Sequence, residues 1–127
     1  MPLLVNVDQR RAVIFVQGEG VVTDQDLLEY VGEYLGNPEF SRYDELFDLT
    51  EADLHDVTYA GLSAVASAAA ATDPGTPSIK IAILVSQVLG VGLSRMYQTL
   101  REVKGGQRLT RVFLDRSECM EWLGLAS

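Results

Sequence analysis

The chain has 127 residues, 47% of them hydrophobic and 22% charged, and its formal net charge at pH 7 is −8. These values predict one domain over residues 1–127. They argue against a nucleic-acid partner, which needs a basic surface, and against a membrane span, since no apolar run approaches ~20 residues. A single cysteine, Cys119, excludes an internal disulfide, and the N-terminus shows no signal-peptide pattern, so we expect a cytoplasmic protein.

The first expected element is an antiparallel hairpin. Apolar residues alternate over residues 3–7 and recur over residues 12–17, with a polar turn at residues 8–11 between them. The segment Gly18-Glu19-Gly20 is expected to end the second strand.

After the hairpin, helix and strand signals alternate along the chain. Helices are indicated by apolar residues at helical spacing, and strands by short aliphatic runs. We expect helices over residues 23–35, 58–72, 91–104 and a short final one to residue 123, capped by Asp115 or Ser117. We expect strands over residues 43–49, 79–85 and 110–114, an acidic loop over residues 50–56, a surface loop over residues 73–77 and a helix end at Gly105-Gly106.

This alternation determines the expected fold class. Strands that alternate with helices need crossover connections, which favour a parallel sheet covered by helices. We therefore predict an α/β fold with a five-stranded, mostly parallel sheet, an N-terminal hairpin and about four helices. Residues 79–85 are apolar on both faces, so this strand is expected at the centre of the sheet.

The order of these segments resembles one known family. The succession of "GEGVVTDQDLLEYV", "ELFDLT", "IKIAILV", "GLSRMYQTL" and "RVFLDRSECMEWL" is similar to that of the SpoIIAA-like proteins, relatives of the STAS (anti-sigma-factor antagonist) domain. The resemblance covers nearly the whole chain. It implies a layer of right-handed β/α units with an edge hairpin, and a domain that is usually non-enzymatic and binds protein partners, nucleotides or small apolar ligands.

The phosphorylation switch of the antagonists is a serine in a "DSSGL" motif before the second helix. Read without a gap, Val57 stands at the switch position and Thr58 at the second serine; aligned on Gly61-Leu62, Tyr59 stands at the switch. Neither alignment supplies the serine. Thr58 is the nearby hydroxyl that a phosphate would use, and a plain N-cap is the favoured role for it. The implied switch or partner surface comprises Asp48, Asp56, Val57, Thr58 and Tyr59.

Acidic residues crowd the stretch around His55. Several converging oxygens would suit a divalent cation, but the spacing does not match an EF-hand loop, and one histidine supplies no second imidazole. We therefore expect a solvated loop without a metal or cofactor. The acidic residues are Asp44, Glu45, Asp48, Glu51, Asp53 and Asp56.

Gly90-Val91-Gly92 follows a strand and opens a helix, as phosphate-binding loops do, but Arg95 stands where a dinucleotide fingerprint needs its third glycine. A tight turn and close helix packing are the expected role of the glycines. The alternative is an anion or ligand contact at Gly92, Ser94 and Arg95.

Aromatic residues on helix faces are candidates for the lining of any pocket, because they combine an apolar body with a polar tip. These residues are Tyr30, Tyr34, Tyr97 and Trp122. Cys119 has no partner histidine within sequence reach and is expected to be an inert, semi-buried thiol.

Three functions fit these residues. The first is a non-enzymatic binding or interaction module for a protein partner or a small apolar ligand. The second is a regulator of the anti-sigma-factor-antagonist type without the usual switch serine, and the third is a small enzyme that uses the acidic loop 48–56. Residues 1–56 carry a net charge of −10 and residues 57–127 a net charge of +2. A solvated surface without a partner is the favoured interpretation of this polarity, and a charged partner or a homodimer is the alternative.

Overall fold

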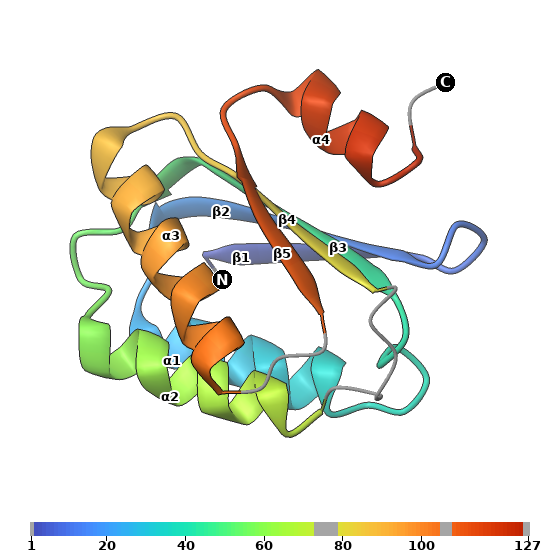
Figure 1. Cartoon of the computed structure of the whole chain (residues 1–127), viewed down its shortest axis with the longest axis horizontal. Coiled ribbons are helices and arrows are strands. Elements are labelled where there is room, and N and C mark those ends of the chain that lie inside the picture. The colour runs from blue at the N-terminus through green and yellow to red at the C-terminus, as the bar shows by residue number, and fades with distance from the viewer. Residues whose placement is uncertain (1, 73–78, 105–107, 126–127) are drawn as a thin grey trace.

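The computed structural model describes residues 2–72, 79–104 and 108–125 (Figure 1). The expected loop at residues 73–77 and the expected helix end at Gly105-Gly106 lie outside the described residues. The strands are β1 (Leu3–Asp8), β2 (Val13–Val21), β3 (Asp44–Asp53), β4 (Lys80–Leu84) and β5 (Leu109–Phe113). The helices are α1 (Asp24–Tyr30), which continues into the π-helical turn η1 (Val31–Leu35), α2 (Tyr59–Ala70), α3 (Val88–Val103) and α4 (Arg116–Trp122).

The five strands form one sheet in the order β1-β2-β3-β4-β5. β1 pairs antiparallel with β2, and the other neighbours pair parallel. The predicted α/β class, the N-terminal hairpin and the mostly parallel sheet are therefore confirmed. β4 has a strand on each side, as its apolar sequence predicts, but the middle of the sheet is β3 rather than β4.

Helices α1, α2 and α3 lie on one face of the sheet, and α4 lies on the other (Figure 1). Each of the first three connects neighbouring parallel strands, and such crossovers are right-handed. Because the strands follow one another in a single direction across the sheet, crossovers of one hand place all three helices on the same face. α4 follows the last strand and is not subject to this constraint.

Each strand contributes to two apolar layers, because successive side chains point to opposite faces of a sheet. Ile14 and Val16 of β2 belong to the core on the helix side, together with Tyr30 of α1. Phe15 packs on the opposite side, in a core that contains Leu46 of β3. The two faces of the sheet are therefore separate packing environments.

The β2–β3 pair is longer than the sequence predicts. β2 continues past Gly18 to Val21, and β3 continues past Thr50 to Asp53. The two extensions pair with each other after a shift in register that begins at Gln17. The expected strand end at residues 18–20 and the expected loop over residues 50–53 are therefore wrong. Main-chain pairing continues there although glycine and exposed acids are weak strand formers, since strand propensity depends strongly on context.

α3 begins at Val88, three residues before the predicted start, with Gln87 at the N-cap. Gly90 therefore lies in the first turn, where an added Cβ would come within 3.1 Å of the Val85 side chain. The absence of a side chain at Gly90 permits the close packing between this helix and the end of β4 that the sequence predicts. An added Cβ at Gly92 would meet no atom within 4 Å.

The docking of α4 can be tested through Cys119, which is fully buried and whose pKa is raised to about 11 by burial. Because thiolate is scarce and shielded, we expect the folded protein to react with iodoacetamide at about pH 8 at least ~100-fold more slowly than the unfolded chain. Alkylation kinetics measure this rate. The matched control is Val88→Cys in a Cys119→Ser background, since Val88 is 90% exposed. Equal rates for the two thiols would contradict the docked position of α4.

Candidate functional site

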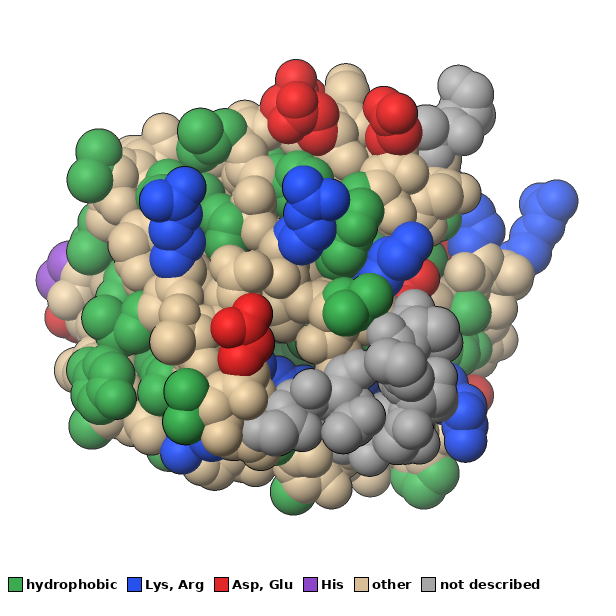
Figure 2. All heavy atoms as spheres, viewed as in Figure 1, with side chains coloured by type: hydrophobic (Ala, Val, Ile, Leu, Met, Phe, Trp, Pro, Cys, Tyr) green, Lys and Arg blue, Asp and Glu red, His purple; other side chains and the backbone are tan. Residues whose placement is uncertain are grey.

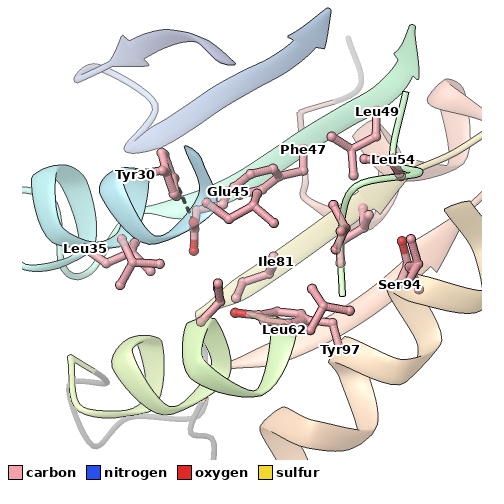
Figure 3. A pocket seen from close by; sticks show the side chains of 16 residues that line it. Tyr30, Leu35, Glu45, Phe47, Leu49, Leu54, Leu62, Ile81, Ser94 and Tyr97 are labelled. Atoms are coloured by element: carbon pink, nitrogen blue, oxygen red, sulfur yellow. Dashed lines mark hydrogen bonds between the residues drawn. The ribbon is translucent and has the colours of Figure 1, made fainter. Parts of the chain in front are cut away.

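A cavity of about 80 Å³ lies between the sheet and the three helices that cover one face of it (Figure 3). Its walls are almost entirely apolar. β3 contributes Glu45, Phe47 and Leu49, and α3 contributes Leu93, Ser94 and Tyr97. The remaining side chains come from β4, α1, η1, α2 and the loop between β3 and α2. Protein interiors are packed closely enough that such a void is uncommon.

One end of the cavity carries a buried polar cluster. Tyr30 and Glu45 are 4% and 1% exposed, and the Tyr30 hydroxyl donates a hydrogen bond of 2.7 Å to Glu45 Oε1. Nη1 of the buried Arg108 lies 3.7 Å from Glu45 Oε2. The same guanidinium donates to the backbone carbonyls of Tyr43 and Ser41. Three polar side chains that are distant in the sequence are thus held together inside the protein.

Burial raises the pKa of Tyr30 well above its usual value, and the negative charge of Glu45 raises this pKa further. The phenol therefore stays protonated and acts as a hydrogen-bond donor to the carboxylate. The Tyr30 ring is fixed by an edge contact with Phe47 and by stacking on Tyr34, with ring centroids 4.9 and 5.3 Å apart respectively.

The local sequence explains where Tyr30 lies. Thr23 caps α1, and it exchanges hydrogen bonds with Asp26 in a capping box. Tyr30 is the last residue of α1, at the point where the helix passes into the π-helical turn η1.

The other end of the cavity approaches the edge of the sheet where the parallel strands end. Leu49 and Leu54 line the cavity and also line a small recess that borders Leu89 in the first turn of α3. Exposed apolar side chains gather near this end, over the N-terminal turns of α2 and α3 (Figure 2). Among them, Tyr59 is 61% exposed and Val88 is 90% exposed.

The structure brings together part of the aromatic set that the sequence suggests for a pocket lining. Tyr30 and Tyr97 line the cavity, and Tyr34 stacks on Tyr30. The expectation for Trp122 is wrong, because this side chain packs against Phe113 on the α4 side of the sheet. Helical spacing alone does not show on which face of the sheet a helix packs.

Thr58 forms a clasp between α1 and α2. It is the N-cap of α2, and its hydroxyl accepts a hydrogen bond from Gly61 N at 2.9 Å. The Thr58 hydroxyl and backbone N–H also donate to the two oxygens of Asp24, at 2.7 and 3.0 Å. An added Cβ at Gly61 would overlap the Asp24 carboxyl group. The serine-type hydroxyl nearest the switch position is thus engaged in a structural contact.

The other residues of the implied switch surface do not gather around Thr58. Val57 is half-buried and lines the cavity, whereas Tyr59 is exposed. Asp56 lies beside His55, 3.1 Å from its Nε2. Asp48 lies on the α4 side of the sheet, where it accepts hydrogen bonds from the main chain and hydroxyl of Thr50 and forms an ion pair with Arg116.

The residues suggested for an anion contact are also separated. Ser94 is buried and faces the cavity, Arg95 is exposed, and Gly92 is exposed in the second turn of the helix. Since α3 begins at Val88, these residues lie beyond its first turn, whose N–H groups would hold an anion.

His55 lies between two carboxylates. Its Nδ1 is hydrogen-bonded to Asp53, and this bond, followed by the charges of Asp53 and Asp56, raises the pKa of His55 above its usual 6.5. Within residues 2–72, 79–104 and 108–125, no three His, Cys, Asp or Glu side chains are grouped as a metal site would require.

A second hollow lies on the α4 side of the sheet, as a groove of about 400 Å³. Arg11 and Arg116 flank it, and each guanidinium is paired with a carboxylate, Asp8 at 2.7 Å and Asp48 at 3.2 Å. Because both positive charges are already neutralised, the groove does not present an anion site.

From the sequence alone, Glu45 is only one acid among several, and Arg108 has no expected role. A usable signal exists, however. Glu45 has the same strand parity as Phe47 and Leu49, so alternation places it on the helix side of β3. A carboxylate at an inward position indicates a buried polar partner. The identity of that partner, 63 positions later in the chain, has no local signal.

A scan against protein-family models finds no match for this chain, and a search of curated proteins finds none. Among the helices that the structure describes, none is long and apolar enough to cross a membrane.

The clasp between α1 and α2 predicts opposite effects for two glycine substitutions. Gly61→Ala should destabilise the fold by roughly 1–3 kcal/mol, because the new methyl group displaces Asp24. Gly92→Ala is the matched control in an exposed helical position and should stabilise by up to about 1 kcal/mol. Denaturant unfolding measures both values. If Gly61→Ala is as stabilising as Gly92→Ala, Asp24 does not occupy the N-terminus of α2.

The surroundings of His55 predict a pH dependence. Its raised pKa means that its contacts stabilise the fold below the ordinary pKa of histidine, and that this contribution is lost as the pH rises through the raised value. In an NMR titration, Asp53→Asn should return the pKa of His55 toward 6.5, whereas Glu118→Gln on α4 should leave it unchanged. An unchanged pKa in Asp53→Asn would contradict the assigned cause.

Proposed function

We propose that this chain is a non-enzymatic binding module of the SpoIIAA-like type that holds a small apolar ligand in the cavity between the sheet and α1–α3. The observation that carries the proposal is the cavity itself, an apolar space with polar groups concentrated at one end. Ligand sites commonly combine apolar walls with a few placed polar groups.

The size of the cavity indicates the size of its ligand. A volume of about 80 Å³ offers room for roughly two or three waters, at about 30 Å³ each. A cavity of about 150 Å³ accepts benzene. The ligand that fits without rearrangement is therefore a short molecule. A longer one would have to displace Leu49 or Leu54 toward the recess beside α3.

The arrangement of the acidic residues favours a binding module over the alternatives. Thr58 already donates its hydroxyl to Asp24, so a phosphate there would meet a carboxylate of like charge. An enzyme that uses the loop 48–56 would need its polar side chains to converge. Asp48 instead lies on the α4 side of the sheet, away from His55. Both considerations support the ligand-binding proposal.

The proposal is tested by filling the cavity. Native mass spectrometry of freshly purified protein should show a retained small molecule, and xenon under pressure should shift NMR methyl signals of residues that line the cavity. Leu93→Phe places extra volume into the cavity and should abolish both signals. Leu114→Phe is the matched control, because Leu114 is 70% exposed. A clean apo mass together with no saturable xenon shift would overturn the proposal.

A further inference from the structure

The N-terminal hairpin places β1 at one edge of the sheet. Among the described strands, β1 pairs with β2 alone, in register along its whole length. Pro2 O accepts a hydrogen bond from Glu19 N, and hydrogen-bonded pairs recur at every second residue of an antiparallel ladder. The even-numbered residues of β1 therefore pair with β2. The N–H and C=O groups of Leu3, Val5 and Val7 point toward the open edge.

This edge has few of the features that usually prevent the addition of a strand. Native sheets protect their edges with short strands, bulges, prolines or charged side chains, especially lysine. β1 has a continuous register and one charged residue, Asp8 at its end, which is paired with Arg11. The opposite edge strand, β5, carries the exposed Arg111 at its centre. β1 is thus the edge that is better suited to accept a further strand.

On the helix side of the sheet, β1 borders an acidic hollow. Leu3 and Val5 line this hollow of about 130 Å³, and Asp26, Glu29 and Glu33 line it from α1 and η1. Within the described part of the chain, none of these three carboxylates forms an ion pair. A side chain that enters the hollow from an added strand is therefore favoured if it is positively charged.

On the α4 side of the sheet, β1 borders the groove of about 400 Å³. Leu4 and Asn6 of β1 line this groove together with Phe15 of β2 and Met120 of α4. Leu4 is 47% exposed although it is an aliphatic residue. Because the two arginines of the groove are already paired with carboxylates, its apolar side chains are the groups that remain to be covered. An added strand would meet an acidic hollow on one face and an apolar groove on the other.

We propose that β1 is the docking edge for an extended segment of another protein in which basic and apolar residues alternate. The segment pairs antiparallel with β1, and its successive side chains point to opposite faces of the sheet. Its lysines or arginines enter the hollow and meet Glu29 and Glu33, while their aliphatic stems pack against Tyr34. Its apolar residues enter the groove beside Leu4 and Phe15.

A second copy of this chain matches the edge less well. In an antiparallel two-fold pairing of β1 with itself, both copies would place α1 and η1 on the same face of the joined sheet. The carboxylates of Glu29 and Glu33 would then approach those of the other copy, and like charges repel. A basic segment replaces this repulsion with attraction. Charge complementarity therefore favours a partner of different sequence.

The first test compares two capped heptapeptides of the same composition in NMR titrations of the full chain. One alternates lysine and valine and begins and ends with lysine; the other has its three valines in succession. We expect the alternating peptide to bind at least about tenfold more tightly and to shift the amide signals of Leu3, Val5 and Val7. A third peptide, with glutamate in place of lysine, should bind at least about tenfold more weakly. Equal affinity for the first two peptides, or no saturable binding of the alternating one, would overturn the proposal.

N-methylation separates main-chain pairing from charge attraction. Residues directly opposite each other in an antiparallel pair share a face, so the lysines lie opposite Leu3, Val5 and Val7 and donate their N–H groups to β1. Methylation of the lysine amides should abolish binding, whereas methylation of the valine amides should change the affinity by less than about threefold. Strand addition is contradicted if both methylated peptides bind equally well.

Charge reversal tests the role of the hollow. Glu29→Lys/Glu33→Lys should transfer the preference from the lysine peptide to the glutamate peptide, and both positions are exposed, so the fold is retained. Glu102→Lys/Glu121→Lys is the matched control, with the same change of charge at exposed positions on α3 and α4, and should keep the preference for lysine. An unchanged preference in the first variant would overturn the proposal. Concentration-dependent dimerisation of the free chain with protection of the β1 amides would assign the edge to a second copy and would also overturn it.

Discussion

A carboxylate buried in an apolar layer is stable only where hydrogen-bond donors or opposite charges contact it. Glu45 is such a carboxylate, and the partners it requires come from distant parts of the fold. Tyr30 reaches it from the end of α1, and Arg108 reaches it from the residue before β5. Arg108 is in turn fixed by the carbonyls of the segment that leads into β3. One buried interaction thus joins the first helix, the middle strand and the last strand. The cavity lies against this cluster, so its polar end is held in place by contacts that also hold the fold together.

The sheet separates this site from the other candidate features of the chain. Because α1, α2 and α3 follow crossovers of one hand, the cavity forms where the three helices approach the same face of β3 and β4. Beside this cavity, the clasp from Asp24 to Thr58 and Gly61 holds α1 against the N-terminus of α2. On the opposite face, Asp48 and Arg116 neutralise each other beside α4. On both faces the charged groups are paired, Asp48 with Arg116 beside α4 and Glu45 with Arg108 at the cavity.

Features that depend on local pattern were predictable from the sequence, and features that depend on distant partners were not. The hairpin, the alternating strands and helices, and Thr58 as an N-cap follow from short-range spacing and are confirmed. The extension of β2 and β3 was missed, since pairing across strands sustains it despite glycines and exposed acids. Tyr30 and Tyr97 were expected in a pocket because of their residue type. The contact between Asp24 and Thr58 spans 34 positions, and no local rule indicates it.

The loop between β3 and α2 supports the proposed binding module over a phosphorylation switch. A phosphorylation switch needs an accessible hydroxyl whose modification changes the surface. The alignments place Val57 or the exposed Tyr59 at the switch and Thr58 between them, and Val57 and Thr58 have other physical tasks. Val57 turns its apolar side chain into the cavity wall, and Thr58 uses its hydroxyl and its main-chain N–H to hold Asp24. The same short loop therefore closes the cavity on one side and fixes α1 to α2 on the other. Both tasks favour a rigid wall on this side of the cavity.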